Sequence, residues 1–327
     1  MQKIIKINSE IPLIGTIMFG LIDRGTNLIQ VRPTSLCNLN CSYCSVDSGE
    51  KSKTRISAYI VERKHLVNWL KQVAECKGEN LEANIDSVGE VLMYLEIIEL
   101  VQDIKKIKQI NKISMQTNGV LLTKEKINGL EKAGLDSINL SINSLDSELA
   151  KELSGCSWYD INKILEIAKE INNSKIELLL APVYIKGIND NEIIKLIKLA
   201  KELGCKIGIQ KYEVYKFGRK IENVKEMSWY KFYDQLKKWE NEYKIKLRLG
   251  PLDFGIKRCK KIPKVFNKND KIRVKIMLQG WMKNQMIGVA NNRCITINNC
   301  NSKIGDIVNI KIIEDKNELY IGEVRKI

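Results

Sequence analysis

Short apolar runs alternate with longer amphipathic stretches from about residue 28 to residue 250. Apolar residues three or four apart indicate a helix with one buried face, whereas short runs bounded by glycine, proline or polar residues indicate strands. The predicted strands lie within 28–33, 81–90, 112–119, 135–143, 176–187 and 205–215, and the predicted helices within 58–78, 91–110, 124–134, 160–173 and 190–203. Strands joined by helical crossovers predict a parallel α/β sheet, curled or open.

The pattern changes near residues 247–255 (LRLGPLDFG), where a proline and two glycines mark a boundary. Beyond it, short β-rich runs separated by turn residues lie at 271–278, 285–292, 293–297, 306–315 and 318–327. Five short strands of this kind fit a small antiparallel β-barrel. We therefore predict three parts, namely an N-terminal cap segment (1–27), an α/β domain (28–258) and a C-terminal β-barrel (259–327).

Composition limits the class of protein. A chain of 327 residues can bury a sizeable core without disulfides. The first residues lack the apolar stretch of a secretory signal, and no apolar run approaches the length of a membrane span, so we expect a cytoplasmic protein that does not contact membranes.

The net charge is +15, and residues 260–327 alone carry +8, from 14 Lys and Arg against 6 Asp and Glu. That asymmetry favours a polyanion as partner.

Three of the nine cysteines lie within eight residues, in CNLNCSYC (37–44), straight after the first predicted strand. Thiolates hold both structural zinc and iron–sulfur clusters. A closed zinc site needs a fourth Cys or His, and the only histidine, His65, falls on a predicted helix. A four-iron cubane on three thiolates would leave one iron open for a substrate or cofactor. The pattern therefore favours an iron–sulfur cluster over zinc.

The spacing Cys37-x3-Cys41-x2-Cys44 resembles the motif of the radical S-adenosylmethionine (SAM) enzymes. Tyr43 adds to the likeness, because the family has an aromatic residue there that packs against the adenine of SAM. The resemblance spans about residues 28–255. It implies a partial six-stranded (β/α) barrel of radical SAM type and a [4Fe–4S] cluster on the three cysteines, whose open iron chelates SAM.

The resemblance also implies the chemistry. One electron from the cluster cleaves SAM to a 5′-deoxyadenosyl radical, which abstracts hydrogen from the substrate. A reductant such as ferredoxin or flavodoxin would supply that electron.

Polar residues at the ends of the next strands extend the likeness. Gly89 and Glu90 match the family's glycine-glycine-glutamate stretch, with Val88 in place of the first glycine, and a carboxylate suits the ammonium group of SAM. Asn118 follows the third strand in QTNG, where the family also has a short polar cluster. Ser141 and Asn143 follow the fourth strand, where the family often places groups for the ribose hydroxyls. An ordinary strand-to-helix turn or cap is the alternative at each position.

Two further segments resemble more specific proteins. Residues 19–33 resemble uncharacterised archaeal members of the superfamily. Asp23 and Arg24 there are either substrate-side polar groups or structural residues, as an ion pair or loop anchors. The C-terminal barrel resembles the TRAM domain, an OB-like module of RNA-modifying enzymes. Its candidate RNA-binding residues are Lys271, Arg273, Lys275, Trp281, Lys283 and Arg293. The alternative is that the barrel only covers the active site.

The leading functional hypothesis is a radical SAM enzyme that modifies an RNA, most plausibly a transfer RNA base. A second hypothesis is radical SAM modification of a protein, peptide or cofactor precursor, with the barrel as a docking module. A third is a structural zinc or iron–sulfur protein that binds RNA, which the polar positions around Gly89 and Ser141 argue against.

Overall fold

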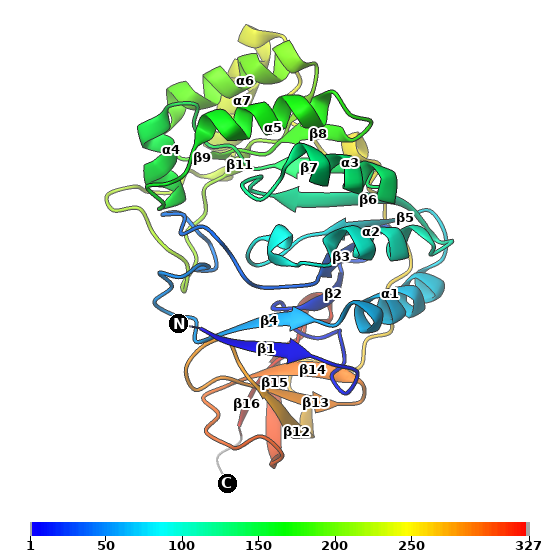
Figure 1. Ribbon diagram of the computed structural model, residues 1–327. Coiled ribbons are helices and arrows are strands. Elements are labelled where there is room, and N and C mark those ends of the chain that lie inside the picture. The colour runs from blue at the N-terminus through cyan, green and yellow to red at the C-terminus, as the bar shows by residue number, and fades with distance from the viewer. Residues whose placement is uncertain (1, 325–327) are drawn as a thin grey trace.

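The computed structural model describes residues 2–324, and its largest sheet has seven strands (Figure 1). In spatial order they are β10 (Lys206–Ile207), β8 (Glu177–Leu180), β7 (Ser137–Leu140), β6 (Ile110–Thr117), β5 (Leu81–Ile85), β3 (Leu28–Arg32) and β2 (Gly20–Asp23). The six strands from β10 to β3 run parallel, and β2 is antiparallel to β3 at the edge. The predicted parallel α/β sheet is confirmed, with β2 as an additional strand.

Helices connect the parallel strands, as the amphipathic stretches predicted. They are α1 (Arg63–Lys77), α2 (Ile97–Lys105), α3 (Lys124–Ala133), α4 (Ser147–Ser154), α5 (Ile161–Asn172) and α6 (Asp190–Leu203), and a further helix, α7 (Trp229–Tyr243), follows the last parallel strand. α2 contacts β6, α5 contacts β8 and α6 contacts β10. The predictions for α3, α5 and α6 are confirmed within one residue at each end, whereas α4 and α7 were not predicted. The prediction for 91–110 was too long, because a 3₁₀ turn, η1 (Val91–Met93), precedes the shorter α2.

Residues 57–61, the greater part of which was predicted as the start of a helix, form strand β4 (Ser57–Val61) instead. β4 pairs in parallel with β1 (Lys3–Ile7), outside the main sheet. Ala58, Tyr59 and Val61 are all completely buried, so this segment lacks the solvent-facing side of an amphipathic helix. The helical period begins only at Arg63, where α1 starts.

The N-terminal segment lies between the main sheet and the C-terminal barrel. Although β2 falls within the predicted cap, it belongs to the main sheet. Farther towards the N-terminus, the Ile14 carbonyl accepts the Cys294 N–H at 2.8 Å, and the Gly15 carbonyl accepts the Tyr320 N–H at 2.9 Å. A Cβ atom at Gly15 would lie 1.9 Å from the Cys294 carbonyl oxygen, so only glycine permits this approach. The predicted boundaries at residues 27 and 258 stay a prediction.

The C-terminal strands close into a barrel, in the order β12 (Lys271–Gln279), β13 (Met286–Ala290), β14 (Arg293–Asn298), β16 (Ile321–Val324) and β15 (Ile307–Glu314). Each predicted run overlaps one of these strands, and β12 and β14 each extend one residue beyond their runs. The pairs are antiparallel as predicted, except that β14 and β16 run parallel. The barrel has its own apolar core, which includes Ile276, Ile295, Ile310 and Tyr320. The likeness to a TRAM domain stays a prediction.

The remaining elements are short. β9 (Val183–Tyr184) and β11 (Gln210–Lys211) form a parallel pair that extends β8 and β10, and η2 (Pro251–Phe254) and η3 (Lys316–Glu318) are 3₁₀ turns. Within residues 2–324, the helices are all too short or too polar to cross a membrane.

Candidate active site

The predicted site residues line one cavity at the carboxyl edge of the sheet, with a volume of about 400 Å³. This volume lies within the range of about 300–1,000 Å³ that is usual for small-molecule sites. The loop after β3 supplies Cys37, Cys41, Tyr43 and Cys44, and the loops after β5, β6 and β7 supply Gly89, Glu90, Asn118, Ser141 and Asn143. The carboxyl ends of parallel strands meet at one edge, which explains why residues so far apart in sequence converge. Their roles in binding stay a prediction.

The thiols are held in an environment that disfavours free thiolates. Burial raises the pKa of Cys37 well above its ordinary range and that of Cys41 to about 12, and the neighbouring thiols contribute to both shifts. The Ser48 N–H donates to Cys44 Sγ at 3.2 Å. Metal ligation would replace the thiol protons and offset the cost of burying charge, and N–H donors to sulfur tune the potentials of iron–sulfur clusters.

The donor set fits a cluster with one open iron. Among residues 2–324, no three His, Cys, Asp or Glu side chains converge closely enough to hold a single metal ion. A cubane spreads three thiolates over three irons, so its ligands do not have to converge on one point. The only histidine of the sequence, His65, contacts the Ile11 carbonyl at 2.8 Å. Three thiols on the wall of a polar cavity are therefore suited to a [4Fe–4S] cluster.

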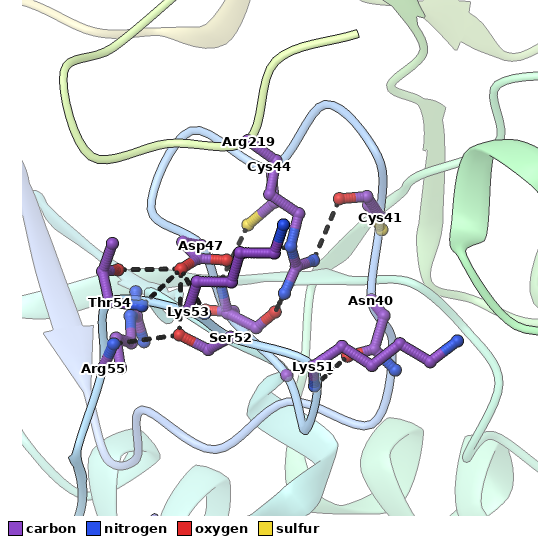
Figure 2. Close-up of polar contacts among 12 residues, drawn as sticks. Asn40, Cys41, Cys44, Asp47, Lys51, Ser52, Lys53, Thr54, Arg55 and Arg219 are labelled. Carbon is purple, nitrogen blue, oxygen red and sulfur yellow. Dashed lines mark hydrogen bonds and ion pairs between the residues drawn. The ribbon is translucent and has the colours of Figure 1, made fainter.

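Arg219, in the segment between β11 and α7, holds the cysteine loop from outside (Figure 2). Its backbone N–H donates to the Cys44 carbonyl at 2.8 Å, and its guanidinium donates to the carbonyls of Cys41, at 3.0 Å, and Ser48. Its Nε forms an ion pair with Asp47 at 2.9 Å, and the two side chains are only 17% and 4% exposed. Only arginine has a planar group whose separate nitrogens can reach one carboxylate and two carbonyls at the same time. Sequence reasoning missed this residue.

Asp47 organises the second half of the same loop (Figure 2). Its Oδ2 accepts bonds from the Ser52 hydroxyl, the Lys53 N–H and both the N–H and hydroxyl of Thr54, at 2.8–3.0 Å. Burial alone would raise the pKa of Asp47, but the bonds from Thr54, Ser52 and Lys53 outweigh it and lower the pKa. The charged carboxylate and Arg219 thus fix the loop that carries the three cysteines.

Arg55 links the cysteine loop to the C-terminal barrel. Its guanidinium donates to the carbonyls of Val46 at 2.7 Å and Val88 at 3.0 Å, and it lies 4.2 Å from the ring centroid of Trp281. Burial lowers the pKa of Arg55 to about 10, while the thiols of Cys44 and Cys37 oppose that shift. One buried cation therefore contacts the cysteine loop, the loop after β5 and the barrel.

Gly89 and Glu90 pack directly against the residues that lead into Cys37. A Cβ atom at Gly89 would lie 2.1 Å from the Leu36 carbonyl oxygen, and the Glu90 N–H donates to that oxygen at 2.6 Å. The glycine therefore permits a close approach of two backbones. The Glu90 side chain is 2% exposed, and burial raises its pKa.

The Glu90 carboxylate is held by protein donors on the next strand end. Oε1 accepts the Thr117 hydroxyl at 2.6 Å and the Leu92 N–H at 3.0 Å, and Oε2 accepts the Asn118 N–H at 2.8 Å. Oε2 therefore keeps one acceptor position for a ligand. The Asn118 side chain bonds Asn38 of the cysteine loop at 2.8 Å, so in this structure it ties two loops together.

Tyr43 and Asn143 contact each other across the cavity. The Asn143 amide donates to the Tyr43 hydroxyl at 2.5 Å, and its Oδ1 accepts the Val183 N–H at 2.7 Å. Burial raises the pKa of Tyr43. Asn143 thus orients the tyrosine and the strand after β8. The Ser141 N–H donates to the Thr117 carbonyl at 2.9 Å, and this is the only hydrogen bond of Ser141 among the described residues.

Of the two candidates in residues 19–33, Asp23 does not face the cavity. It is 3% exposed, and its carboxylate pairs with Lys77 Nζ at 2.7 Å and accepts the N–H groups of Gly25 and Ile262. Arg24 bonds the Gln30 side chain at 2.9 Å. Asp23 is therefore a structural ion-pair partner, the second of the two interpretations.

The candidate RNA-binding residues of the barrel divide into two groups. Lys271, Arg273, Lys275 and Lys283 are exposed. Trp281 is only 7% exposed beneath Arg55, so the prediction that it stacks on a base is wrong. Arg293 is 8% exposed and donates to the carbonyls of Asn292 and Pro263, so its prediction as an RNA-binding residue is also wrong. Trp281 attaches the barrel to Arg55, and Arg293 bonds the segment that leads into the barrel.

Comparisons of sequence agree with this site. A family model described as the Radical SAM superfamily matches residues 31–200. An uncharacterized protein of Methanocaldococcus jannaschii is 41% identical, over 99% of this chain and 81% of its own length. A GTP 3′,8-cyclase of Desulforamulus reducens is 28% identical, over 57% of this chain and 55% of its own length. The chain thus spans little more than half of that cyclase.

Comparisons of structure show a similar fold at low sequence identity. SuiB of Streptococcus suis matches with a TM-score of 0.54 and 20% identity, over 74% of this chain and 50% of its own. Its complex with S-adenosylmethionine matches with a TM-score of 0.53 and 22% identity, over 66% and 47%. A structure of anSMEcpe with bound AdoMet matches with a TM-score of 0.53 and 20% identity, over 68% and 61%.

Proposed function

We propose a reaction for this site on the premise that the chain belongs to the radical SAM superfamily. Members of that superfamily bind a [4Fe–4S] cluster and S-adenosylmethionine, and this protein is a radical SAM enzyme. The proposed reaction is abstraction of hydrogen from an RNA, with a transfer RNA base as the target. The observation that carries the proposal is the convergence of three thiols and a polar strand-end set on one cavity of about 400 Å³.

Bound on Cys37, Cys41 and Cys44 and reduced, the cluster would supply the electron that cleaves SAM to a 5′-deoxyadenosyl radical. The chain's own part is to hold and orient the reactants. Glu90 Oε2, with its remaining acceptor position, would bind the ammonium of SAM. Tyr43, fixed by Asn143, would pack against the adenine.

The size of the cavity limits how much of a large substrate can enter it. A volume of about 400 Å³ suits the cofactor and one further group, not a folded polymer. Enzymes that act on a nucleobase take it out of the stack and enclose it, which satisfies this limit. The net positive charge and the exposed lysines of the C-terminal barrel favour a polyanion as the molecule that presents the base.

A second candidate is a protein, peptide or cofactor precursor as substrate. The similarity to a GTP 3′,8-cyclase over about half of both chains favours it, because that relative is named for a small nucleotide. In this case the barrel would be a docking module or a cover for the cavity. The buried contact between Arg55 and Trp281 is compatible with either role.

The experiment is anaerobic reconstitution with iron and sulfide, followed by SAM and a strong reductant, with and without bulk transfer RNA. Formation of 5′-deoxyadenosine that increases with RNA supports the proposal. If formation of 5′-deoxyadenosine does not change with RNA but increases with a peptide, protein or nucleotide fraction, the second candidate is supported. A verified cluster that never cleaves SAM would contradict the proposed reaction.

Two variants assign roles within the same assay. Cys41→Ala should lose the cluster and all SAM cleavage, whereas Cys76→Ala, a thiol on α1 outside the cavity, should retain both. Glu90→Gln should retain the cluster but bind SAM weakly, because it removes the charge and keeps the shape of the side chain. Full cleavage by Cys41→Ala would refute the assignment of the cluster.

A further inference from the structure

An exposed aromatic surface lies between β11 and the middle of α7. The described part of the chain exposes six large aromatic side chains, and five of them fall within residues 215–233. Their exposed fractions are 49% for Tyr215, 48% for Phe217, 51% for Trp229, 81% for Tyr230 and 48% for Tyr233. Exposed apolar patches mark interaction sites, whereas singly exposed hydrophobic residues need no explanation. We call these five residues the aromatic surface.

Part of the aromatic surface is rigid. The rings of Trp229 and Tyr233 are nearly parallel, with centroids 5.8 Å apart and an angle of 26° between their planes. Both contact the edge-on ring of Phe232, which is only 2% exposed and anchors this turn of α7 in the core. A platform held in place before binding loses little conformational entropy when a planar ligand stacks on it.

One member of the aromatic surface lines the cavity, and a second contacts a residue that lines it. Lys211 and Tyr215 line the cavity. Lys211 Nζ also lies 5.0 Å from the ring centroid of Trp229, and the Val214 N–H donates to Glu226. These two contacts bring the start of the segment 211–229 against its end. In Figure 1 this yellow-green segment runs beside the blue cysteine loop, and the bonds from Arg219 join the two.

Lysines are interspersed with the aromatic residues along this segment. Lys216, Lys220, Lys225, Lys231 and Lys237 are exposed and form no ion pair within the described residues. Glu213, Glu226 and Asp234 in the same segment are each paired with a lysine, so Glu222 is the one acidic residue of 211–237 without such a pair in residues 2–324. The surface therefore combines exposed rings with an excess of positive charge.

Lysines interleaved with stacking aromatics match single-stranded nucleic acid, which offers phosphates and unstacked bases together. A polypeptide partner would have to be acidic and would not require parallel rings. The barrel is a weaker candidate for base stacking, because its Trp281 is buried beneath Arg55.

We propose that the aromatic surface binds a single-stranded RNA segment and delivers the adjoining base into the cavity. This inference rests on the proposed function and names the surface that recognises its substrate.

The test is RNA binding by the reconstituted full-length protein, measured by fluorescence anisotropy with a labelled single-stranded oligonucleotide and with bulk transfer RNA as competitor. Tyr230→Ala and Trp229→Ala should each weaken binding roughly 5- to 150-fold, which corresponds to about 1–3 kcal/mol of stacking per base. Trp158→Ala is the matched control, since Trp158 is 57% exposed and lies outside the aromatic surface. It should bind like the unaltered protein.

Charge is tested separately from stacking. Lys220→Gln combined with Lys231→Gln should reduce the slope of log affinity against log salt by about 1.4, at about 0.7 per phosphate contact on a single strand. SAM cleavage without RNA should stay unchanged in all these variants, which confirms that they fold and hold the cofactors.

Failure of this inference and of the proposed function can be told apart. If the unaltered protein binds RNA and the aromatic and lysine variants bind it equally well, the inference is overturned and the RNA substrate stands. If the unaltered protein binds no RNA and SAM cleavage increases only with a protein fraction, the RNA substrate is overturned. The inference then falls with it.

Discussion

Replacing Gly89 by alanine tests how closely the loop after β5 supports the cysteine loop. A Cβ atom there would lie 2.1 Å from the Leu36 carbonyl oxygen and 2.7 Å from that of Ser35, and both are backbone atoms that cannot rotate away. Ordinary contact begins at 3.4 Å, so the two loops must separate by about 1.3 Å. That movement would also stretch the bond between the Glu90 N–H and the Leu36 carbonyl, now 2.6 Å.

The magnitude follows from these two effects. Overpacking costs about 1–3 kcal/mol, and a lost buried hydrogen bond adds about 0.5–1.5 kcal/mol. We therefore expect Gly89→Ala to lower the free energy of unfolding of the cluster-free protein by about 2–4 kcal/mol. Because Leu36 precedes Cys37, the displacement also moves a cluster ligand, and we expect less iron and sulfide per chain after reconstitution.

The assay pairs urea unfolding with iron and sulfide analysis, and Gly250→Ala is the control. Gly250 has a φ of −116°, and a Cβ atom there would meet nothing closer than 3.9 Å. Its free energy of unfolding should stay within about 0.5 kcal/mol of the unaltered protein or increase slightly. The reasoning is refuted if Gly89→Ala unfolds like Gly250→Ala and holds a full complement of iron.

Three further predictions address other parts of the molecule. Arg219→Lys should lose the forked contact with Asp47 and two loop carbonyls, so a chelator should remove iron several-fold faster; an unchanged rate would argue against this restraint. Lys77→Ala should cost about 3–5 kcal/mol in urea, because it leaves Asp23 charged, unpaired and buried; a cost below about 1 kcal/mol would contradict this. Burial raises the pKa of the Cys294 thiol above its ordinary 9.0, so above pH 9 the unfolded chain releases this proton while the folded chain keeps it. Stability should therefore decline above pH 9 by up to about 1.4 kcal/mol per pH unit more than in Cys294→Ala, and equal slopes of unfolding free energy against pH would exclude this contribution.

Several elements and site residues of this protein follow from local sequence patterns. Residues 190–203 were predicted as a helix and form α6 with the same bounds, because amphipathic period and end signals belong to neighbouring residues. The cysteine loop follows β3 as expected, and Gly89 and Glu90 lie beside it in the cavity. These residues are each placed by a strand end, and the topology of a parallel sheet brings strand ends together.

Errors arose where burial overrides local pattern. Residues 57–61 were predicted in large part as the start of α1, but four of the five are buried, and the segment pairs with the N-terminal strand and adopts a β conformation. Trp281 and Arg293 carry the composition typical of an RNA-binding face, yet both are buried at contacts within the protein. Composition alone does not distinguish an exposed ring from a buried one.

The sequence by itself determined the alternation of strands and helices, the C-terminal barrel strands and the residues that line the cavity. Each of these follows from spacing along the chain or from the regular geometry of a parallel sheet. Only the tertiary structure decided that Arg219 clamps the carbonyl of Cys41, 178 residues away, that Arg55 lies over Trp281, and that Lys211, which lines the cavity, contacts the ring of Trp229 on α7. Such contacts depend on how all the packed elements fill space together, and no short stretch of sequence contains that information.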